Sequence, residues 1–138
     1  MMINRLSVAT IWVKDQNEAL RFYTEKLGFE IRADVTNGDF RWLTIGLKDQ
    51  PELEFLLAAV KPSHALTQEE ANQLTKVVEA GKLGIGPWKT NDCQKTYETL
   101  KAKGVEFVQP PTDRPYGIIE AIFKDNSGNV MVLSQDKA

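Results

Sequence analysis

Apolar and polar residues alternate along the first strand-like segment of the chain. In residues 6–13 one set of side chains faces one way (Ala9, Ile11 and Val13) and a second set faces the other (Val8, Thr10 and Trp12). This period-two pattern predicts a half-buried strand. Similar short segments bounded by Gly, Pro, Asn and Asp predict seven further strands: 29–35, 40–47, 52–58, 83–90, 105–108, 117–124 and 129–134.

Three helices are predicted between these strands, from helical spacing of apolar residues and from N-terminal capping signals. The capping signals are Asp15 with Glu18, Thr67 with Glu70, and Asn91 or Asp92 with Gln94. A glycine follows each helix, as expected for a left-handed C-terminal residue: Gly28, Gly81 and Gly104. The middle helix, 68–79, has only a narrow apolar stripe, so it is interpreted as a surface linker helix or a flap over a site.

The second half of the chain repeats the order of the first. Asp15 and Asn91 lie 76 positions apart, and so do Gly28 and Gly104. Self-similarity of this kind indicates two copies of one strand-helix-strand-strand-strand unit. We therefore predict an α+β fold in a single domain of residues 1–138, with module one at 1–60, an insertion at 61–82 and module two at 83–138. Each module would be a small sheet with a helix on one face, and a cleft would form where the modules meet.

Composition narrows the class of protein. The chain has 138 residues, 42% of them hydrophobic and 26% charged, with a formal net charge of −2. No block of Lys and Arg suggests a nucleic-acid partner, and no apolar run is long enough for a membrane span. The first residues do not resemble a secretory signal, so a cytoplasmic location is expected. Cys93 is the single cysteine, which excludes an internal disulfide.

Two stretches of sequence carry a family resemblance. Residues 8–30, VATIWVKDQNEALRFYTEKLGFE, and residues 123–135, FKDNSGNVMVLSQ, resemble the opening and closing motifs of the vicinal-oxygen-chelate superfamily. This is the glyoxalase/bleomycin-resistance/dioxygenase family. The resemblance implies paired βαβββ modules whose U-shaped, mixed sheet surrounds a cavity. Many members bind a divalent metal in that cavity, whereas bleomycin-resistance proteins capture a drug without metal at a dimer groove.

The family's metal ligands can be sought one position at a time. The resemblance places them at Val8, Glu54, Ile85 and Val132. A first-row metal needs about three or four ligands of the His, Cys, Asp or Glu type. Three of the four positions are aliphatic, so we predict that the chain has no metal site and needs no cofactor. The metal-dependent glyoxalase and dioxygenase activities are disfavoured accordingly.

Strand alternation selects the side chains that would face the cavity. The predicted ligand-binding residues are Thr10, Trp12, Phe40, Trp42, Glu54, Arg114, Tyr116 and Glu120. Aromatic and apolar walls with a few polar groups are typical of small-molecule pockets. The two tryptophans could equally fill an interface between modules or between subunits. Glu54 and Glu120 are weak candidates for a general base, with a solvated rim or an ion pair as the alternative.

Two further side chains have reactive groups. His64 is interpreted as a surface loop residue that could carry a proton only if the insertion folds over the cleft. Cys93 begins a helix, where its pKa could be lowered, but its position in the helix favours a structural role.

Three functions remain open at this point. The leading hypothesis is a metal-free, homodimeric binder of an apolar or aromatic small molecule. The second is a metal-independent enzyme with Glu54 or Glu120 as general base, and the third is a scaffold or regulatory protein. Fold alone does not choose between them.

Overall fold

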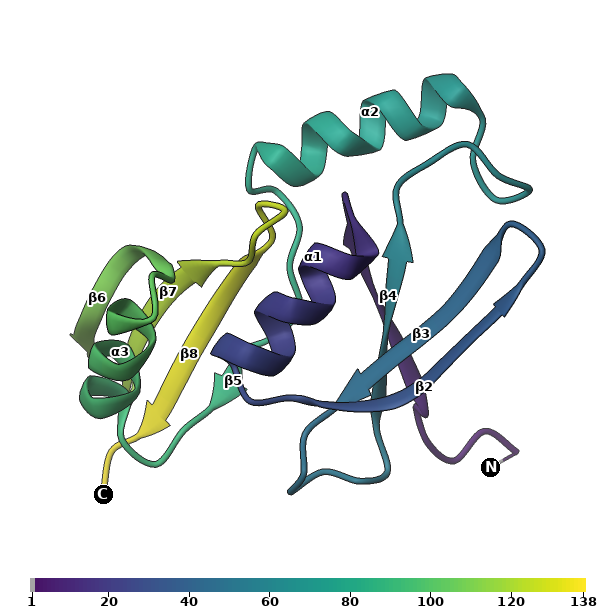
Figure 1. The fold of residues 1–138 in the computed structure, drawn as a ribbon. Helices are drawn as coiled ribbons and strands as arrows, with labels where there is room; N and C mark the ends of the chain where they lie inside the picture. The colour runs from purple at the N-terminus through teal and green to yellow at the C-terminus, as the bar shows by residue number, and fades with distance from the viewer. Residues whose placement is uncertain (1) are drawn as a thin grey trace. The chain divides into compact units, whose positions relative to one another are not determined.

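The computed structural model describes residues 2–138, which form two compact parts, one up to Thr75 and one from Lys76. Each part contains one four-stranded mixed sheet with a helix, and the two repeat the same βαβββ order (Figure 1). The α+β fold of two repeated modules predicted from the sequence is therefore confirmed. In residues 2–138 no helix combines the length and the apolar character needed to cross a membrane.

The first part contains six elements and the start of a seventh. They are β1 (Val8–Val13), α1 (Gln16–Arg21), a π-helical turn η1 (Phe22–Lys26), β2 (Glu30–Asn37), β3 (Phe40–Gly46), β4 (Glu54–Ala59) and α2 (Gln68–Glu79). The strand order is β1-β4-β3-β2, with β1 parallel to β4 and the other neighbours antiparallel. The consecutive strands β2, β3 and β4 thus form a meander. Strand β1 pairs with the other side of β4 and forms one edge of the sheet.

One face of this sheet forms the hydrophobic core with the first helix. Ile11 and Val13 on β1 are buried, as are Phe55 and Leu57 on β4. The helix begins at Asp15, whose carboxylate accepts a hydrogen bond from the backbone N–H of Glu18 at 2.8 Å. The π-helical turn then directs two consecutive aromatic residues, Phe22 and Tyr23, into the core. Because alternate residues of a strand face opposite ways, the residues between them are available to the other face.

A tight hairpin joins β2 to β3. Asn37 pairs with Phe40, which leaves Gly38 and Asp39 as the two residues of the turn. Gly38 has φ of 62°, and it is the only one of the two with a positive φ. Glycine at the first central position is the pattern of a type II′ turn, whose twist suits a hairpin. The Asn-Gly pair therefore marked the hairpin correctly, but Asn37 ends the strand instead of occupying the turn.

The linker helix α2 has the predicted bounds. The hydroxyl of Thr67 accepts from the backbone N–H of Glu70 at 3.1 Å, and the Glu70 carboxylate accepts from the N–H of Thr67 at 2.8 Å. This reciprocal capping box fixes the start of the helix. Gly81, with φ of 73°, follows its end.

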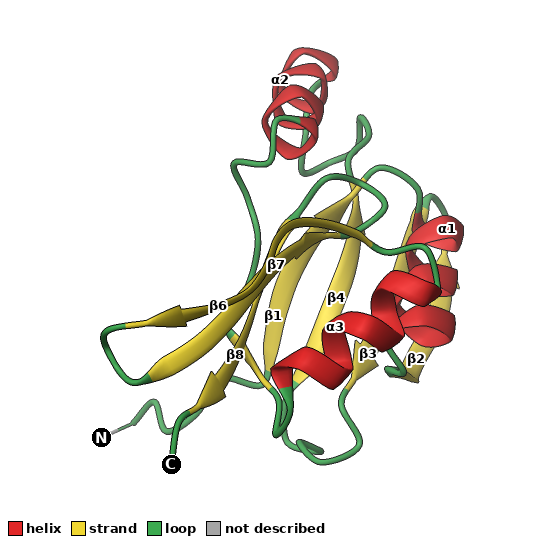
Figure 2. Ribbon diagram, turned by 90° about the vertical axis from the view of Figure 1, so that its left-hand side faces the viewer, coloured by secondary structure: helices red, strands yellow, loops and turns green. Residues whose placement is uncertain are grey.

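The second part repeats the topology with different strand lengths. Its elements are β5 (Trp88–Lys89), α3 (Cys93–Ala102), β6 (Glu106–Arg114), β7 (Ile118–Lys124) and β8 (Val130–Asp136), in the order β5-β8-β7-β6. Helix α3 lies on one face of this sheet (Figure 2), where Leu100, Phe123 and Met131 are buried. Asp92, one of the two predicted capping residues, caps α3 by accepting from the N–H of Lys95 at 2.9 Å.

Two predicted strands of this module have the wrong length. The segment 83–90 contributes only the two-residue β5, because a Cβ on Gly84 would lie 1.8 Å from the carbonyl oxygen of Val130 and Pro87 has no N–H to donate. The strand predicted at 105–108 instead continues to Arg114. It is an edge strand with register shifts beside Gln109, and an edge tolerates the two prolines at 110–111.

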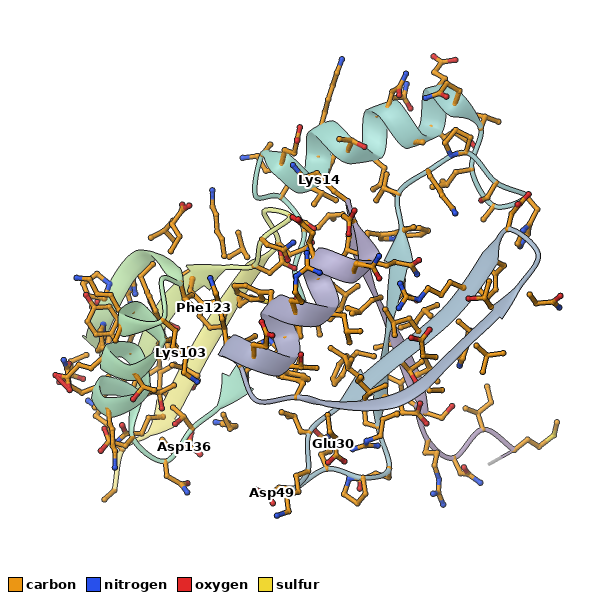
Figure 3. All side chains as sticks on the ribbon, viewed as in Figure 1. Lys14, Glu30, Asp49, Lys103, Phe123 and Asp136 are labelled. Carbon is orange, nitrogen blue, oxygen red and sulfur yellow. The ribbon has the colours of Figure 1, made fainter. Side chains whose placement is uncertain are left out.

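The turns before the last strand of each module are held in different ways. In the second module the buried Asp125 carboxylate accepts hydrogen bonds, each of 2.9 Å, from the backbone N–H groups of Ser127, Gly128 and Asn129. In the first module, Asp49 lies exposed at the corresponding turn (Figure 3). There the Arg32 guanidinium donates to the carbonyl groups of Leu47 at 2.7 Å and of Pro51 at 3.0 Å.

Candidate functional site

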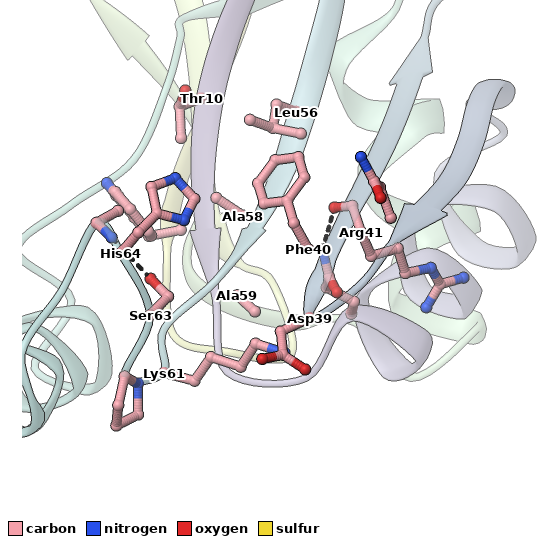
Figure 4. Close-up of a pocket in the computed structure, with 15 residues that line it drawn as sticks. Thr10, Asp39, Phe40, Arg41, Leu56, Ala58, Ala59, Lys61, Ser63 and His64 are labelled. Carbon is pink, nitrogen blue, oxygen red and sulfur yellow. Dashed lines mark hydrogen bonds between the residues drawn. The ribbon is translucent and has the colours of Figure 1, made fainter.

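A cavity of about 660 Å³ lies within the first part, on the sheet face opposite the buried core. Its walls come from the strands β1 and β4, the start of α1, the β2–β3 hairpin and the loop after β4 (Figure 4). The lining residues are Thr10, Trp12, Gln16, Asn37, Asp39, Phe40, Arg41, Leu56, Ala58, Ala59, Lys61, Pro62, Ser63, His64 and Ala65. The volume falls within the range of small-molecule pockets, so a drug-sized molecule would fit.

The floor of this cavity is mainly apolar. Thr10 pairs with Leu56 and Trp12 pairs with Ala58 in the parallel β1–β4 ladder, so these four side chains form two adjacent rows. They alternate with the buried residues of the core face. The small side chain of Ala58 beside the indole of Trp12 leaves space over the sheet, and a flat apolar surface results.

The rim of the cavity is mainly polar, with one phenylalanine, and comes from two segments. The hairpin contributes Asp39 and Phe40, and the loop contributes Lys61 and His64. The ring centroids of Phe40 and His64 are 6.1 Å apart with an interplanar angle of 58°. This distance lies within the range of ring-to-ring contact, so the loop and the hairpin meet at this pair.

Arg41 anchors the hairpin beside the cavity. Its guanidinium donates two hydrogen bonds of 2.9 Å to the two carboxylate oxygens of Asp34, and a third of 2.6 Å to the side-chain oxygen of Asn17. The pairing lowers the pKa of Asp34 and raises the pKa of Arg41. The Gln16 side-chain amide donates to the carbonyl of Leu57 at 2.7 Å and ties α1 to β4. Both interactions hold the cavity wall in place.

The substitution Asp34→Asn should reduce the free energy of unfolding at pH 6 by about 0.5–1 kcal/mol, a modest amount because the ion pair is partly exposed and screened. The pKa of Asp34 is lower in the folded state than in the unfolded chain, so the stabilisation is complete above the unfolded value near 3.9 and is lost as pH falls below it. Urea unfolding of both proteins at pH 6 and at pH 3 would measure this. A difference that stays constant between the two pH values would contradict the assignment.

The sequence-predicted site residues of the first module separate into two groups. Thr10, Trp12 and Phe40 line the cavity, whereas Trp42 and Glu54 are not among its lining residues. Glu54 lies at the start of β4 and accepts a hydrogen bond of 2.6 Å from the hydroxyl of the fully buried Thr44. Trp42 is partly exposed on β3, opposite Val35 of β2.

The three predicted site residues of the second module are joined through Glu120. The Arg114 guanidinium donates to the Glu120 carboxylate at 2.8 Å and to the side-chain oxygen of Gln109 at 2.8 Å. The hydroxyl of Tyr116 donates to the same Glu120 oxygen at 3.2 Å. The ion pair that the sequence left as an alternative for Glu120 is therefore present, with Arg114 as the partner.

Several lining residues were not predicted from the sequence, above all His64 and Lys61. Both are exposed, as the composition of their loop suggests, and a backbone turn also brings them to the cavity. In that turn the N–H of Ser63 donates to the carbonyl of Leu66 at 2.8 Å. The only available signal was the position of the loop in the sequence. It directly follows β4, and Ala58 and Ala59 at the end of this strand line the cavity.

The residues at the family's metal positions do not fit a metal ion. Val8, Ile85 and Val132 offer no donor atom, and the Glu54 carboxylate is engaged by Thr44. Among residues 2–138, no group of three or more His, Cys, Asp or Glu side chains is placed to hold a metal. The antiparallel pairing of Thr44 with Leu56 matches that of Ile122 with Val132, so Leu56, another aliphatic residue, is the first-module counterpart of Val132.

The pKa of Cys93 is raised, whereas a helix N-terminus would be expected to lower it. Its side chain is fully buried at the start of α3, and burial raises the pKa of the thiol, with a further contribution from the carboxylates of Asp92 and Glu120. Desolvation outweighs the favourable position at the helix N-terminus. The thiol is therefore a packing group of the second module, in agreement with the structural role predicted for it.

Comparisons with known proteins agree with this architecture. A family model described as the Glyoxalase/Bleomycin resistance protein/Dioxygenase superfamily matches residues 5–133. The uncharacterised protein YurT of Bacillus subtilis (strain 168) is 36% identical over 131 residues, which cover 95% of this chain and 98% of YurT.

Solved structures show the same similarity. The crystal structure of UcmS2 is 44% identical, with a TM-score of 0.92 over 98% of this chain and 100% of UcmS2. TnmS3 from Streptomyces sp. CB03234, described as an antibiotic binding protein, is 27% identical, with a TM-score of 0.77 over 99% of both chains. The repeated modules, the closing motif around Asp125 and these matches lead to one conclusion: the chain belongs to the glyoxalase/bleomycin resistance protein/dioxygenase superfamily.

Proposed function

We propose that this protein is a metal-independent binding protein that captures a small, mostly apolar or aromatic molecule without changing it chemically. The observation that carries the proposal is the cavity of about 660 Å³, with a mainly apolar floor that includes Trp12 and with the ring of Phe40 at its rim. Burial of a flat ring against Trp12, Leu56 and Ala58 would supply the binding free energy. The polar rim would orient the ligand.

The similarity to TnmS3 supports a binding role and suggests a ligand class. That protein is described as binding an antibiotic, and its chain matches this one over its whole length. An antibiotic of aromatic character, met in the cytoplasm, is the ligand we propose for this chain. Capture of such a molecule would lower its free concentration by mass action.

The two carboxylates considered as a general base favour binding over catalysis. Glu54 is bonded to Thr44, Glu120 is bonded to Arg114 and Tyr116, and neither lines the cavity. A base must lie within hydrogen-bond reach of the proton that it removes from the substrate. A ligand recovered unchanged after incubation with the protein would agree with binding, whereas a new product would support an enzyme.

We also propose that the protein is a homodimer. Val35 and Trp42 face each other across β2 and β3, and both are exposed, at 60% and 37%. Val35 lies on the edge strand β2, and a second copy of the chain packed there would cover this apolar pair. Light scattering would test the assembly, and a monomeric mass at micromolar concentration would contradict it.

Tryptophan fluorescence tests the binding proposal directly, because Trp12 is part of the cavity floor. Titration with a panel of aromatic compounds should give saturable quenching, with the compound recovered intact. The substitution Trp12→Phe should remove most of the quenching and weaken binding about tenfold, as expected for loss of a large contact. The matched control is Trp88→Phe in the second module, which should keep the affinity. Equal effects of the two substitutions would contradict the assignment of the pocket.

A further inference from the structure

The net charge of the cavity wall depends on one side chain. The lining residues from β1, β4 and α1 are not ionisable, so the ionisable groups come from the hairpin and from the loop after β4. Arg41 is neutralised by its two hydrogen bonds to Asp34. Asp39 and Lys61 contribute one charge of each sign. His64 is the remaining group, and histidine is the side-chain type whose charge ordinarily changes between pH 5 and 8.

The loop geometry holds His64 at the wall. The backbone N–H of Ala65 donates to the hydroxyl of Ser63 at 3.0 Å, and the N–H of Ser63 donates to the carbonyl of Leu66 at 2.8 Å. These bonds close a tight turn with His64 at its centre. The ring contacts Phe40 across the cavity mouth, and Figure 4 shows the two rings on either side of Ala58. A ligand on the apolar floor would therefore lie beside the imidazole.

We propose that His64 sets the charge preference of the pocket, so that aromatic acids bind better when its imidazole is protonated and neutral aromatic molecules bind better when it is not. The inference rests on the proposed binding function and names the ligand class of that site. His64 is exposed at the cavity mouth, where an imidazolium would attract the carboxylate or sulfonate of a bound ligand. A neutral ligand offers no opposite charge, so its binding would remove water from the imidazolium without compensation. This cost disfavours the complex.

Linkage gives a second consequence that can be measured by a different method. A ligand that prefers the protonated imidazole makes His64 hold its proton to a higher pH, and a ligand that prefers the neutral form has the opposite effect. The reciprocity is required by thermodynamics, so the two observations must agree in sign. Since His64 is the only histidine of the chain, its imidazole proton signals in an NMR spectrum are unambiguous.

The experiment uses two fluorescent probes with one aromatic skeleton. Anilinonaphthalene sulfonate is anionic, and phenylnaphthylamine is the neutral molecule without the sulfonate. Their dissociation constants are measured for the intact protein at about pH 5.5 and about pH 8.5, on either side of the ordinary histidine range. We expect the ratio of anionic to neutral affinity to fall by about threefold to tenfold as the pH rises, the size expected for one partly screened charge.

The matched variants are His64→Gln, which keeps a polar side chain of similar size, and Lys61→Gln, which removes a neighbouring permanent charge. With His64→Gln the affinity ratio should no longer depend on pH. With Lys61→Gln the ratio should be lower at both pH values but should keep its pH dependence. In the wild-type protein, the NMR titration midpoint of His64 should move up with the sulfonate and down with the neutral probe.

The outcomes separate this inference from the proposed function. If both probes bind and compete with the aromatic compounds, but the ratio is independent of pH, the role of His64 is wrong and the binding function stands. If the affinity ratio still depends on pH in His64→Gln, the role of His64 is likewise wrong and the binding function stands. If neither probe binds the wild-type protein, the binding function and the inference are both overturned.

Discussion

The substitution Ala58→Trp is expected to weaken ligand binding by about 100-fold or more, equivalent to about 2.7 kcal/mol. Ala58 lies on β4 beside Trp12 and faces the cavity, so a second indole at this position would occupy the space over the floor. A ligand would have to displace that ring, and close-packed protein interiors do not make such room freely. Isothermal titration calorimetry with a compound that binds the wild-type protein would measure the loss.

The fold should tolerate this change. Ala58 is half-buried and lies outside the core face of β4, on which Phe55 and Leu57 are buried. We expect a change of less than about 1 kcal/mol in the free energy of unfolding. The control is Val108→Trp on β6, which adds an indole at a side chain that is 52% exposed and should leave binding unchanged. Unchanged affinity in Ala58→Trp would mean that the ligand binds elsewhere on the protein.

The elements that sequence predicted well depend on local interactions. Helix α2 begins directly after Thr67 because the side chains of Thr67 and Glu70 each accept a hydrogen bond from the other residue's backbone N–H. The two residues are only three positions apart in the sequence. The alternation in β1 likewise assigned Ile11 and Val13 to the core and Thr10 and Trp12 to the cavity. Caps and period-two alternation can be read without knowledge of the partner strand.

The features that sequence did not predict depend on contacts between distant segments. Whether 83–90 forms a full strand depends on the approach of Gly84 to the backbone of Val130, which no local pattern reveals. The extent of β6 depends on its position at a sheet edge, and the place of His64 depends on the turn that carries it toward Phe40. Glu54 is in the predicted strand, but its hydrogen bond to Thr44 cannot be predicted without knowledge of how β3 and β4 pair.

The two modules share a topology but differ in the chemistry of equivalent faces. Trp12 pairs with Ala58 in the first ladder, and Lys89 pairs with Ser134 in the second. Lys89 is engaged by Asp136 at 2.6 Å. An apolar, aromatic position in one module thus corresponds to an ion-paired position in the other. This difference is one reason why we propose the first module as the site that would capture an aromatic ligand.

The substitution Asp125→Ala should be the most damaging single change to stability, lowering the free energy of unfolding by about 3–4 kcal/mol. The carboxylate is 5% exposed and accepts hydrogen bonds from three consecutive backbone N–H groups, those of residues 127–129, and from the Asn129 amide at 2.9 Å. Without it these donors would remain buried without their acceptor, at about 1–3 kcal/mol each before water enters the space. Urea unfolding would measure the loss.

The first module supplies the matched control. Asp49 stands at the corresponding position, but it is exposed, and its turn is held by the Arg32 guanidinium. Asp49→Ala should therefore change stability by less than about 0.5 kcal/mol. Asp125→Asn keeps one acceptor oxygen and should fall between the two alanine variants. If Asp49→Ala and Asp125→Ala lowered the stability equally, the buried hydrogen bonds of Asp125 could not be the cause. The effect would then come from a general preference of the turn for aspartate at this position. A large effect at Asp125 alone would show that its buried hydrogen bonds stabilise the turn before β8, and with it the second sheet.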